Sequence, residues 1–195
     1  MKAAEDIDQP ALPITLQTKL LSIDIESNGL HGKAFAIGAV VMRLDGTVID
    51  EFSARCSIAG ELDPWVEKHV LPVLGEFPQT HRSARVMRDD FWSWYKQAKD
   101  QADYMMVDNG YPVEARFLIS CQDDDIDERY WDHFFPLLDL SSMLLQVGVK
   151  PLAVRYRFVA DQLGDEPILQ HNPRWDAWVS ALAAAKALKM SGRLA

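Results

Sequence analysis

Two carboxylates, Asp24 and Glu26, stand two positions apart in the segment LLSIDIESNGL. Side chains at positions i and i+2 of a β-strand point to the same side, so both carboxylates would share one face of an otherwise apolar strand. Like charges this close repel each other unless a cation neutralises them. Carboxylate oxygens are hard ligands of the kind that Mg²⁺ and Mn²⁺ prefer. The pair therefore indicates a divalent-cation site, although the same pattern also occurs at ordinary solvent-facing strand ends.

A histidine and a further aspartate, His171 and Asp176, accompany a predicted helix start in QHNPRWDAW. Asn172 is a preferred N-cap residue, and Pro173 suits the first helical turn. Asp176 is then expected in the first turns of the last helix and His171 on the loop before it, where the imidazole can fold over the same site. The alternative is an interfacial histidine next to an acid that the helix dipole stabilises.

A fourth carboxylate, Glu114, lies in VDNGYPVEARFL. Pro112 predicts a helix start, which places Glu114 in the first turn of a middle helix. Asp108, at the end of the short apolar segment YMMV, is the competing carboxylate. Glu114 can also be read simply as an acid that a helix N-terminus favours.

The elements that must position these groups follow from the apolar pattern. The first half predicts three consecutive strands, and Asp45-Gly46 between the second and third is a tight-hairpin signal. Strands that alternate with helices follow, which predicts an α/β fold: a mixed central sheet, made of a three-strand antiparallel meander plus parallel strands, flanked by helices. The predicted strands are 19–25, 34–43, 48–56, 104–107 and 134–138. One helix is predicted to start at 64, and the other predicted helices cover 82–98, 111–120, 141–147, 153–163 and 172–190.

Length and composition limit the class of protein. The 195 residues suit one domain, expected over 18–195 after a flexible N-terminal arm over 1–17. No apolar run is long enough to span a membrane, and the N-terminal residues lack the basic and apolar segments of a signal peptide. Cys56 and Cys121 form no CxxC motif, so we expect a cytoplasmic protein. The net charge of −9 argues against bulk electrostatic binding of nucleic acid, but not against an enzyme that holds only a strand end.

Taken together and in this order, the three motifs resemble the DEDDh exonucleases, the DnaQ-like branch of the ribonuclease-H-like fold. The resemblance covers roughly residues 19–190 and rests on a D-x-E pair in the first strand, an acid before Phe-Leu in a middle helix, and H-x4-D-A at the last helix. The segment Trp65–Pro72, followed by Arg82-Ser83 and Arg88-Asp89-Asp90, resembles more narrowly the RNase AS-like exoribonuclease group.

This resemblance implies a metal-dependent 3′→5′ exonuclease that releases nucleoside 5′-monophosphates from the 3′ end of RNA or single-stranded DNA. It implies two Mg²⁺ or Mn²⁺ ions, His171 as the general base, and a homodimer as one oligomeric state. The metal ligands would be Asp24, Glu26, Glu114 and Asp176, and Asn28, Gly29 and Leu30 would wrap the terminal nucleotide.

One departure is that the family usually has Asp where this chain has Glu114. Three outcomes are open: Glu114 binds metal from a slightly shifted helix, Asp108 substitutes for it, or activity is weakened or lost. An impaired exonuclease-fold domain would act as a nucleic-acid or protein binding module. A carboxylate-metal phosphatase that acts on small nucleotides is a further alternative.

Three arginines at intervals of three, Arg82, Arg85 and Arg88, are expected along one face of the helix predicted over 82–98. They could contact substrate phosphates, or they could form an ordinary solvated helix face.

Overall fold

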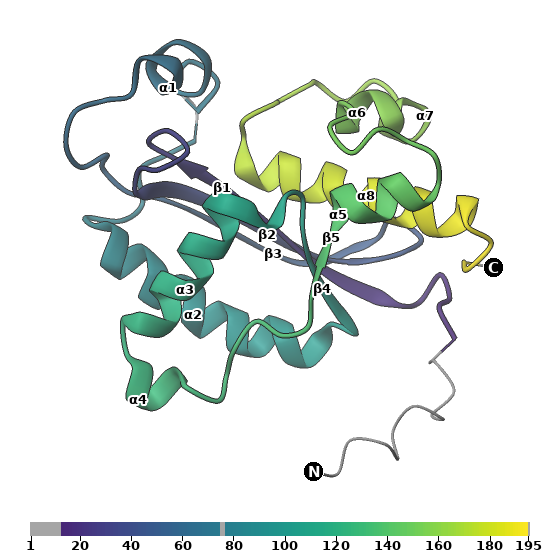
Figure 1. The fold of residues 1–195 in the computed structure, drawn as a ribbon, viewed down its shortest axis with the longest axis horizontal. Coiled ribbons are helices and arrows are strands. Elements are labelled where there is room, and N and C mark those ends of the chain that lie inside the picture. The colour runs from purple at the N-terminus through teal and green to yellow at the C-terminus, as the bar shows by residue number, and fades with distance from the viewer. Residues whose placement is uncertain (1–12, 75–76, 195) are drawn as a thin grey trace.

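The computed structural model describes residues 13–74 and 77–194. A five-stranded sheet in the order β3-β2-β1-β4-β5 forms its centre, with helices on both faces (Figure 1). This is the mixed sheet flanked by helices that the sequence predicts, and that prediction is confirmed.

The first three strands form the predicted antiparallel meander, because β2 pairs with both β1 and β3. The turn between β2 and β3 closes at Gly46, whose φ of 95° lies in the region that glycine tolerates best, and whose N–H donates to the Arg43 carbonyl. The strands are β1 (Lys19–Ser27), β2 (Ala34–Arg43) and β3 (Val48–Arg55).

The two remaining strands, β4 (Tyr104–Val107) and β5 (Leu137–Asp139), extend the sheet in parallel on the other side of β1. The strand predicted over 134–138 is wrong at its start. Pro136 has no N–H to donate to a strand ladder, and the paired segment begins at the next residue.

The helices follow the predicted order with three differences. The second helix starts at Ala84 with Ser83 as its N-cap, the middle helix is preceded by an irregular π-helical turn, and the segment predicted over 153–163 is two short helices separated at Val159. The helices are α1 (Pro64–His69), α2 (Ala84–Gln101), η2 (Gly110–Glu114), α3 (Ala115–Asp123), α4 (Ile126–Arg129), α5 (Leu140–Gln146), α6 (Arg155–Phe158), α7 (Ala160–Leu163) and α8 (Pro173–Met190).

Two hydrophobic cores lie on opposite faces of the sheet. Leu21, Ile23 and Ile25 of β1 pack in the core beneath α2 and α3, while Leu20 packs in the core that contains most of α8. Figure 1 shows α2 and α3 on one side of the sheet and α5, α6 and α8 on the other. This alternation decides which side of β1 carries each of its polar residues.

Of the predicted N-terminal arm, residues 1–12 lie outside the described residues. Its last part follows the sheet, because the Leu16 carbonyl accepts the Asp45 N–H at 3.1 Å and Ile14 packs against the α8 core. None of the helices in the described part of the chain is long and apolar enough to cross a membrane.

Candidate active site

Asp24 and Glu26 occupy the face of β1 that looks toward α8. The intervening Ile25 packs in the opposite core, so the two acids alternate with it. Both acids line one cavity of about 300 Å³, together with Asp176 of α8.

A glycine allows α8 to start against this strand. Gly38 of β2 lies directly opposite Asp24 in the antiparallel register. A Cβ at position 38 would lie 2.0 Å from the Arg174 backbone nitrogen, a distance that no real structure tolerates. Sequence reasoning did not single out Gly38, although a lone glycine inside an apolar strand is a known sign of close backbone approach.

The N-terminus of α8 places Asp176 and His171 next to each other. Asn172 caps the helix, and its side-chain oxygen accepts the Trp175 N–H at 3.2 Å. Asp176 Oδ2 accepts the His171 backbone N–H at 2.6 Å, so the carboxylate also fixes the loop. His171 has a φ of 69°, a left-handed conformation that is uncommon for residues other than glycine and that clusters at functional sites.

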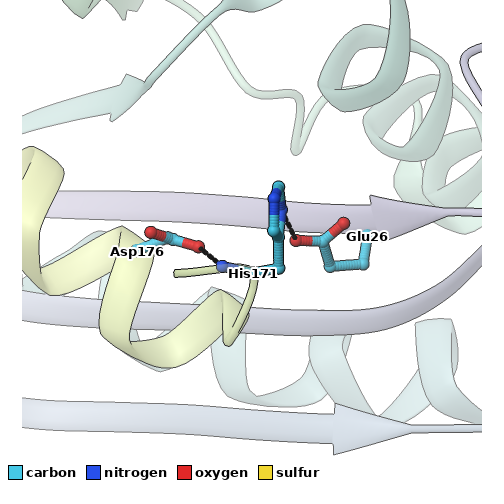
Figure 2. A group of neighbouring side chains, drawn as sticks. All are labelled: Glu26, His171 and Asp176. Atoms are coloured by element: carbon cyan, nitrogen blue, oxygen red, sulfur yellow. Dashed lines mark hydrogen bonds and ion pairs between the residues drawn. The ribbon is translucent and has the colours of Figure 1, made fainter. Parts of the chain in front are cut away.

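The His171 ring bridges the two motifs in space. Its Nδ1 lies 3.4 Å from Glu26 Oε1, and its ring meets Trp65 edge-on at 5.4 Å between centroids. Figure 2 shows the imidazole between the carboxylates of Glu26 and Asp176. One ligand atom from each of Glu26, His171 and Asp176 lies within 4.8 Å of the others, so these three residues could hold a cation.

Glu114 and Asp108 both line the same cavity, but their partners differ. Arg155 Nε lies 2.5 Å from Asp108 Oδ1, and the same guanidinium donates to the Ser141 hydroxyl at 2.9 Å. Glu114 is buried at 8% exposure, and no basic side chain of the described residues lies within 4 Å of it. Asp108 therefore has a basic partner, although burial outweighs the effect of Arg155 and raises its pKa, whereas Glu114 has no such partner among the described residues.

Burial and mutual repulsion raise the pKa values of these acids. Burial raises the pKa of Asp24 well above its ordinary value, and the charges of Asp176, Glu26 and Glu114 raise it further. The pKa of Asp176 rises to about 8, first through burial and then through Glu26. Burial and the nearby Asp108 and Glu26 charges raise the pKa of Glu114 to about 8. Such a cluster is electrostatically incomplete without a cation.

Burial also raises the pKa of Glu26, and the hydrogen bond and charge of His171 partly offset this effect. Reciprocally, the interaction with Glu26 raises the pKa of His171. Each group therefore favours the charged form of the other.

A second, more apolar cavity of about 490 Å³ adjoins the first and shares Glu26 and His171 with it. Leu30 and Trp65 line it and are 65% and 53% exposed. The Asn28 side chain donates to the Glu61 carbonyl and accepts the Asp63 N–H, both at 2.8 Å, so it ties the loop after β1 to the start of α1. Gly29, with a φ of 75°, packs so closely on Asp63 that a Cβ would meet its carboxylate at 2.7 Å.

The three arginines do not share one helical face, which corrects the prediction. Arg82 precedes the N-cap Ser83, so it lies outside α2. Arg85 pairs with Asp89 at 2.9 Å, and Arg88 donates to Asp124 at 2.8 Å.

Comparisons with known proteins give one kind of support. No family model and no curated protein matches the chain. Among solved structures, the zinc ion-bound form of E. coli ExoI in complex with single-stranded DNA has a similar fold, with a TM-score of 0.60 and 14% sequence identity. The match covers 90% of this chain and 41% of that one, so the chain spans about two fifths of the length of that neighbour. This likeness supports the α/β fold with a mixed central sheet that the sequence predicts.

Proposed function

We propose that the protein is a metal-dependent 3′→5′ exonuclease that removes nucleoside 5′-monophosphates from the 3′ end of RNA or single-stranded DNA. The observation that carries this proposal is the convergence of Asp24, Glu26, Glu114, Asp176 and His171 on one cavity. We call these five residues the carboxylate site. The fold shared with a single-stranded-DNA complex supports a nucleic-acid substrate.

The residues of the carboxylate site fit divalent cations. Four acids with oxygen ligands surround one cavity, and burial together with mutual repulsion disfavours their ionised forms when no cation is present. This donor set suits Mg²⁺ or Mn²⁺. Glu26 and Asp176 would hold one ion, Glu114 the other, and Asp24 both. When bound, such ions polarise the scissile phosphate and stabilise the charge on the leaving 3′-oxygen.

His171 is the general base in this proposal. Its imidazole lies at the junction of the two cavities, one lined by the acids and the other by Leu30 and Trp65. With a cation on Glu26, that carboxylate would hold the His171 proton less strongly, and the imidazole could accept a proton from water. The positive-φ backbone and the bond to Asp176 fix the ring in that position.

The terminal nucleotide would occupy the 490 Å³ cavity. The exposed side chains of Leu30 and Trp65 offer apolar surfaces to a base, and the loop that carries Asn28 and Gly29 would wrap the sugar. We also propose Arg82, Arg85 and Arg88 as phosphate contacts. A cytoplasmic location and a homodimer remain predictions from the sequence.

Glu114, rather than Asp108, completes the metal site in this proposal. Asp108 already has Arg155 as its charge partner, and a cation would have to displace that guanidinium. Glu114 has no such partner among the residues described and contributes to the electrostatic strain on Asp24. In this proposal the longer side chain at position 114 takes the place of the usual Asp.

The test is degradation of 3′-labelled RNA and DNA oligonucleotides in Mn²⁺, with Asp24→Ala as the control. We expect stepwise shortening by the wild-type protein and none by the variant. If no substrate is shortened, the enzyme proposal is wrong, and a binding module becomes the better explanation of the fold. Release of inorganic phosphate from a nucleoside monophosphate without strand shortening would instead indicate a phosphatase.

A further inference from the structure

Two hollows continue the surface depression that begins at the carboxylate site. The apolar cavity beside His171 shares Ser27 and Val113 with a hollow of about 110 Å³. That hollow shares Lys33 and Arg88 with another of about 460 Å³ at the start of α2. The hollows therefore follow one another, through shared wall residues, from the acids to the N-terminus of α2.

The charge of these hollows is opposite to that of the whole molecule. The protein has 29 acidic and 20 Lys or Arg residues. Among the described residues that line the two hollows, none is acidic, and five are Lys or Arg. We call these five bases the basic groove: Lys33, Arg82, Arg85, Arg88 and Arg116.

The basic residues of the groove fall into two groups. Arg85 and Arg88 are held by Asp89 and Asp124, which lie outside the walls of the hollows. Lys33, Arg82 and Arg116 have no acidic partner within 4 Å in the described part of the chain.

Arg116 connects the groove with the carboxylate site. Its guanidinium donates to the Leu30 carbonyl at 3.1 Å and lies 3.5 Å from His31 Nδ1. It belongs to α3, which starts directly after Glu114. One arginine thus links the loop after β1 with the helix that follows a metal-ligand candidate.

We propose that the basic groove binds the phosphate backbone of a single-stranded nucleic acid whose 3′ end lies in the carboxylate site. This inference rests on the proposed function, and it adds a path and a direction: the strand runs 5′-ward from Leu30, past Arg116 and Lys33, to Arg82. The negative phosphates would be attracted to this row of Lys and Arg side chains, which has no acid on its walls. The negative net charge of the protein opposes phosphate binding on the rest of its surface.

The groove contacts the backbone rather than the bases. Phe35 and Phe117 on its walls are 1% and 2% exposed, so their rings offer no stacking surface, and the exposed ring of His31 lies with its Nδ1 3.5 Å from the Arg116 guanidinium. Serine hydroxyls and guanidinium groups suit phosphate oxygens. Binding in the groove should therefore depend on strand length and salt but little on sequence.

The test measures binding separately from hydrolysis. A 5′-labelled 12-nucleotide single strand is titrated in Ca²⁺ by fluorescence anisotropy, with wild-type protein, Lys33→Glu/Arg82→Glu, and the charge-matched control Lys96→Glu/Lys189→Glu. All four positions are exposed, and circular dichroism checks that each variant is folded. We expect at least ~10-fold weaker binding in the groove variant and less than ~3-fold in the control.

Salt dependence gives a second readout of the same contacts. The slope of log K against log salt should fall by about 1.4 in the groove variant, because each phosphate contact on a single strand contributes about 0.7. Equal weakening in both variants, an unchanged slope, or no binding by the wild-type protein would overturn the groove. Equally tight binding of an acidic peptide would also overturn it.

Activity then separates this inference from the proposed function. For an active enzyme, the ratio of kcat/KM on the 12-mer to that on a dinucleotide should fall at least ~10-fold in the groove variant, because the dinucleotide leaves most of the groove empty. Groove-dependent binding without hydrolysis would refute the exonuclease and support the groove. Hydrolysis with an unchanged ratio would refute the groove alone.

Discussion

The carboxylate site and the basic groove are linked by the apolar cavity and have opposite electrostatic character. The carboxylate site gathers acids that are largely buried and leaves Asp24 and Glu114 without a basic partner among the described residues. The groove carries Lys and Arg side chains, and two of its arginines, Arg85 and Arg88, have acids behind them. The first region needs cations to be stable in its charged form, while the second is stable alone and merely attracts anions.

This difference determines how each region should respond to mutation. A change inside the carboxylate site alters a compact, coupled cluster, so its effects on turnover should be large and non-additive. A change in the groove removes one exposed contact, and its effect should be modest and sensitive to salt.

Asp24→Asn should have the largest effect. Asp24 lies among the charges of Asp176, Glu26 and Glu114, and the substitution removes the carboxylate that both cations would share. We expect a loss of at least ~10³-fold in kcat/KM with Mn²⁺, comparable to the loss of a central catalytic group. Asp161→Asn, on an exposed loop-side position of α7, serves as the control. If kcat/KM of Asp24→Asn fell by less than tenfold, Asp24 would not be an essential metal ligand.

His171→Ala should have the next largest effect. Loss of a general base costs on the order of 10²–10⁴-fold in rate. If His171 is a base rather than a ligand, the variant should keep its Mn²⁺ affinity, measured by isothermal titration calorimetry. Loss of cation binding would make it a ligand, which its position near Glu26 and Asp176 also permits. His171→Asn, which tolerates the left-handed backbone, controls for local strain.

The contrast between Glu114 and Asp108 can be sharpened with matched amides. Glu114→Gln should lower kcat/KM by about 10²-fold and weaken Mn²⁺ binding, since it removes a ligand. Asp108→Asn should cost less than about tenfold, because Arg155 rather than a cation satisfies that carboxylate. The opposite ranking would assign the metal to Asp108, and equal losses would contradict the distinction between them. Thermal unfolding of both variants checks that neither has simply lost its fold.

The carboxylate site could be predicted from the sequence to a greater extent than the groove. The strand period fixes the common face of Asp24 and Glu26, and a capped helix start fixes Asp176, so local rules already predict these positions. The contact of Gly38 with the start of α8 could not be read from periodicity, because it depends on the register between β1 and β2 and on where α8 crosses. A local signal existed in the lone glycine, but it did not say what would approach it.

The groove was harder to predict because its residues come from four separate segments. Lys33 follows the loop after β1, Arg82 precedes α2, Arg85 and Arg88 belong to α2, and Arg116 belongs to α3. The spacing of three suggested one helical face, yet the N-cap at Ser83 excludes Arg82 from the helix. Only tertiary packing brings these bases to one depression.

The smallest effect that we predict is on the free energy of unfolding. Its dependence on pH should differ between the two regions. The pKa values of Glu114 and Asp176 rise to about 8 in the fold, whereas unfolded carboxyls titrate near pH 4. Between these values the folded state holds protons that the unfolded state has lost, so the free energy of unfolding falls as pH rises. In EDTA we expect a loss of at least ~1 kcal/mol between pH 5 and pH 8, since one pKa unit corresponds to about 1.4 kcal/mol.

Asp89, which pairs with Arg85 of the groove, titrates in the other direction. Although burial opposes it, Arg129 and Arg85 lower the pKa of Asp89, so its contribution is present above pH 4 and is lost only as pH falls through its lowered folded pKa. The decline between pH 5 and pH 8 therefore reports the carboxylate site together with the neighbouring Asp108, whose pKa burial also raises. Chemical denaturation in saturating Mn²⁺ should abolish or reverse that decline, because cations bind the ionised carboxylates. A decline that Mn²⁺ leaves unchanged, or one that is equally steep in Glu114→Gln, would show that these acids are not a cation site.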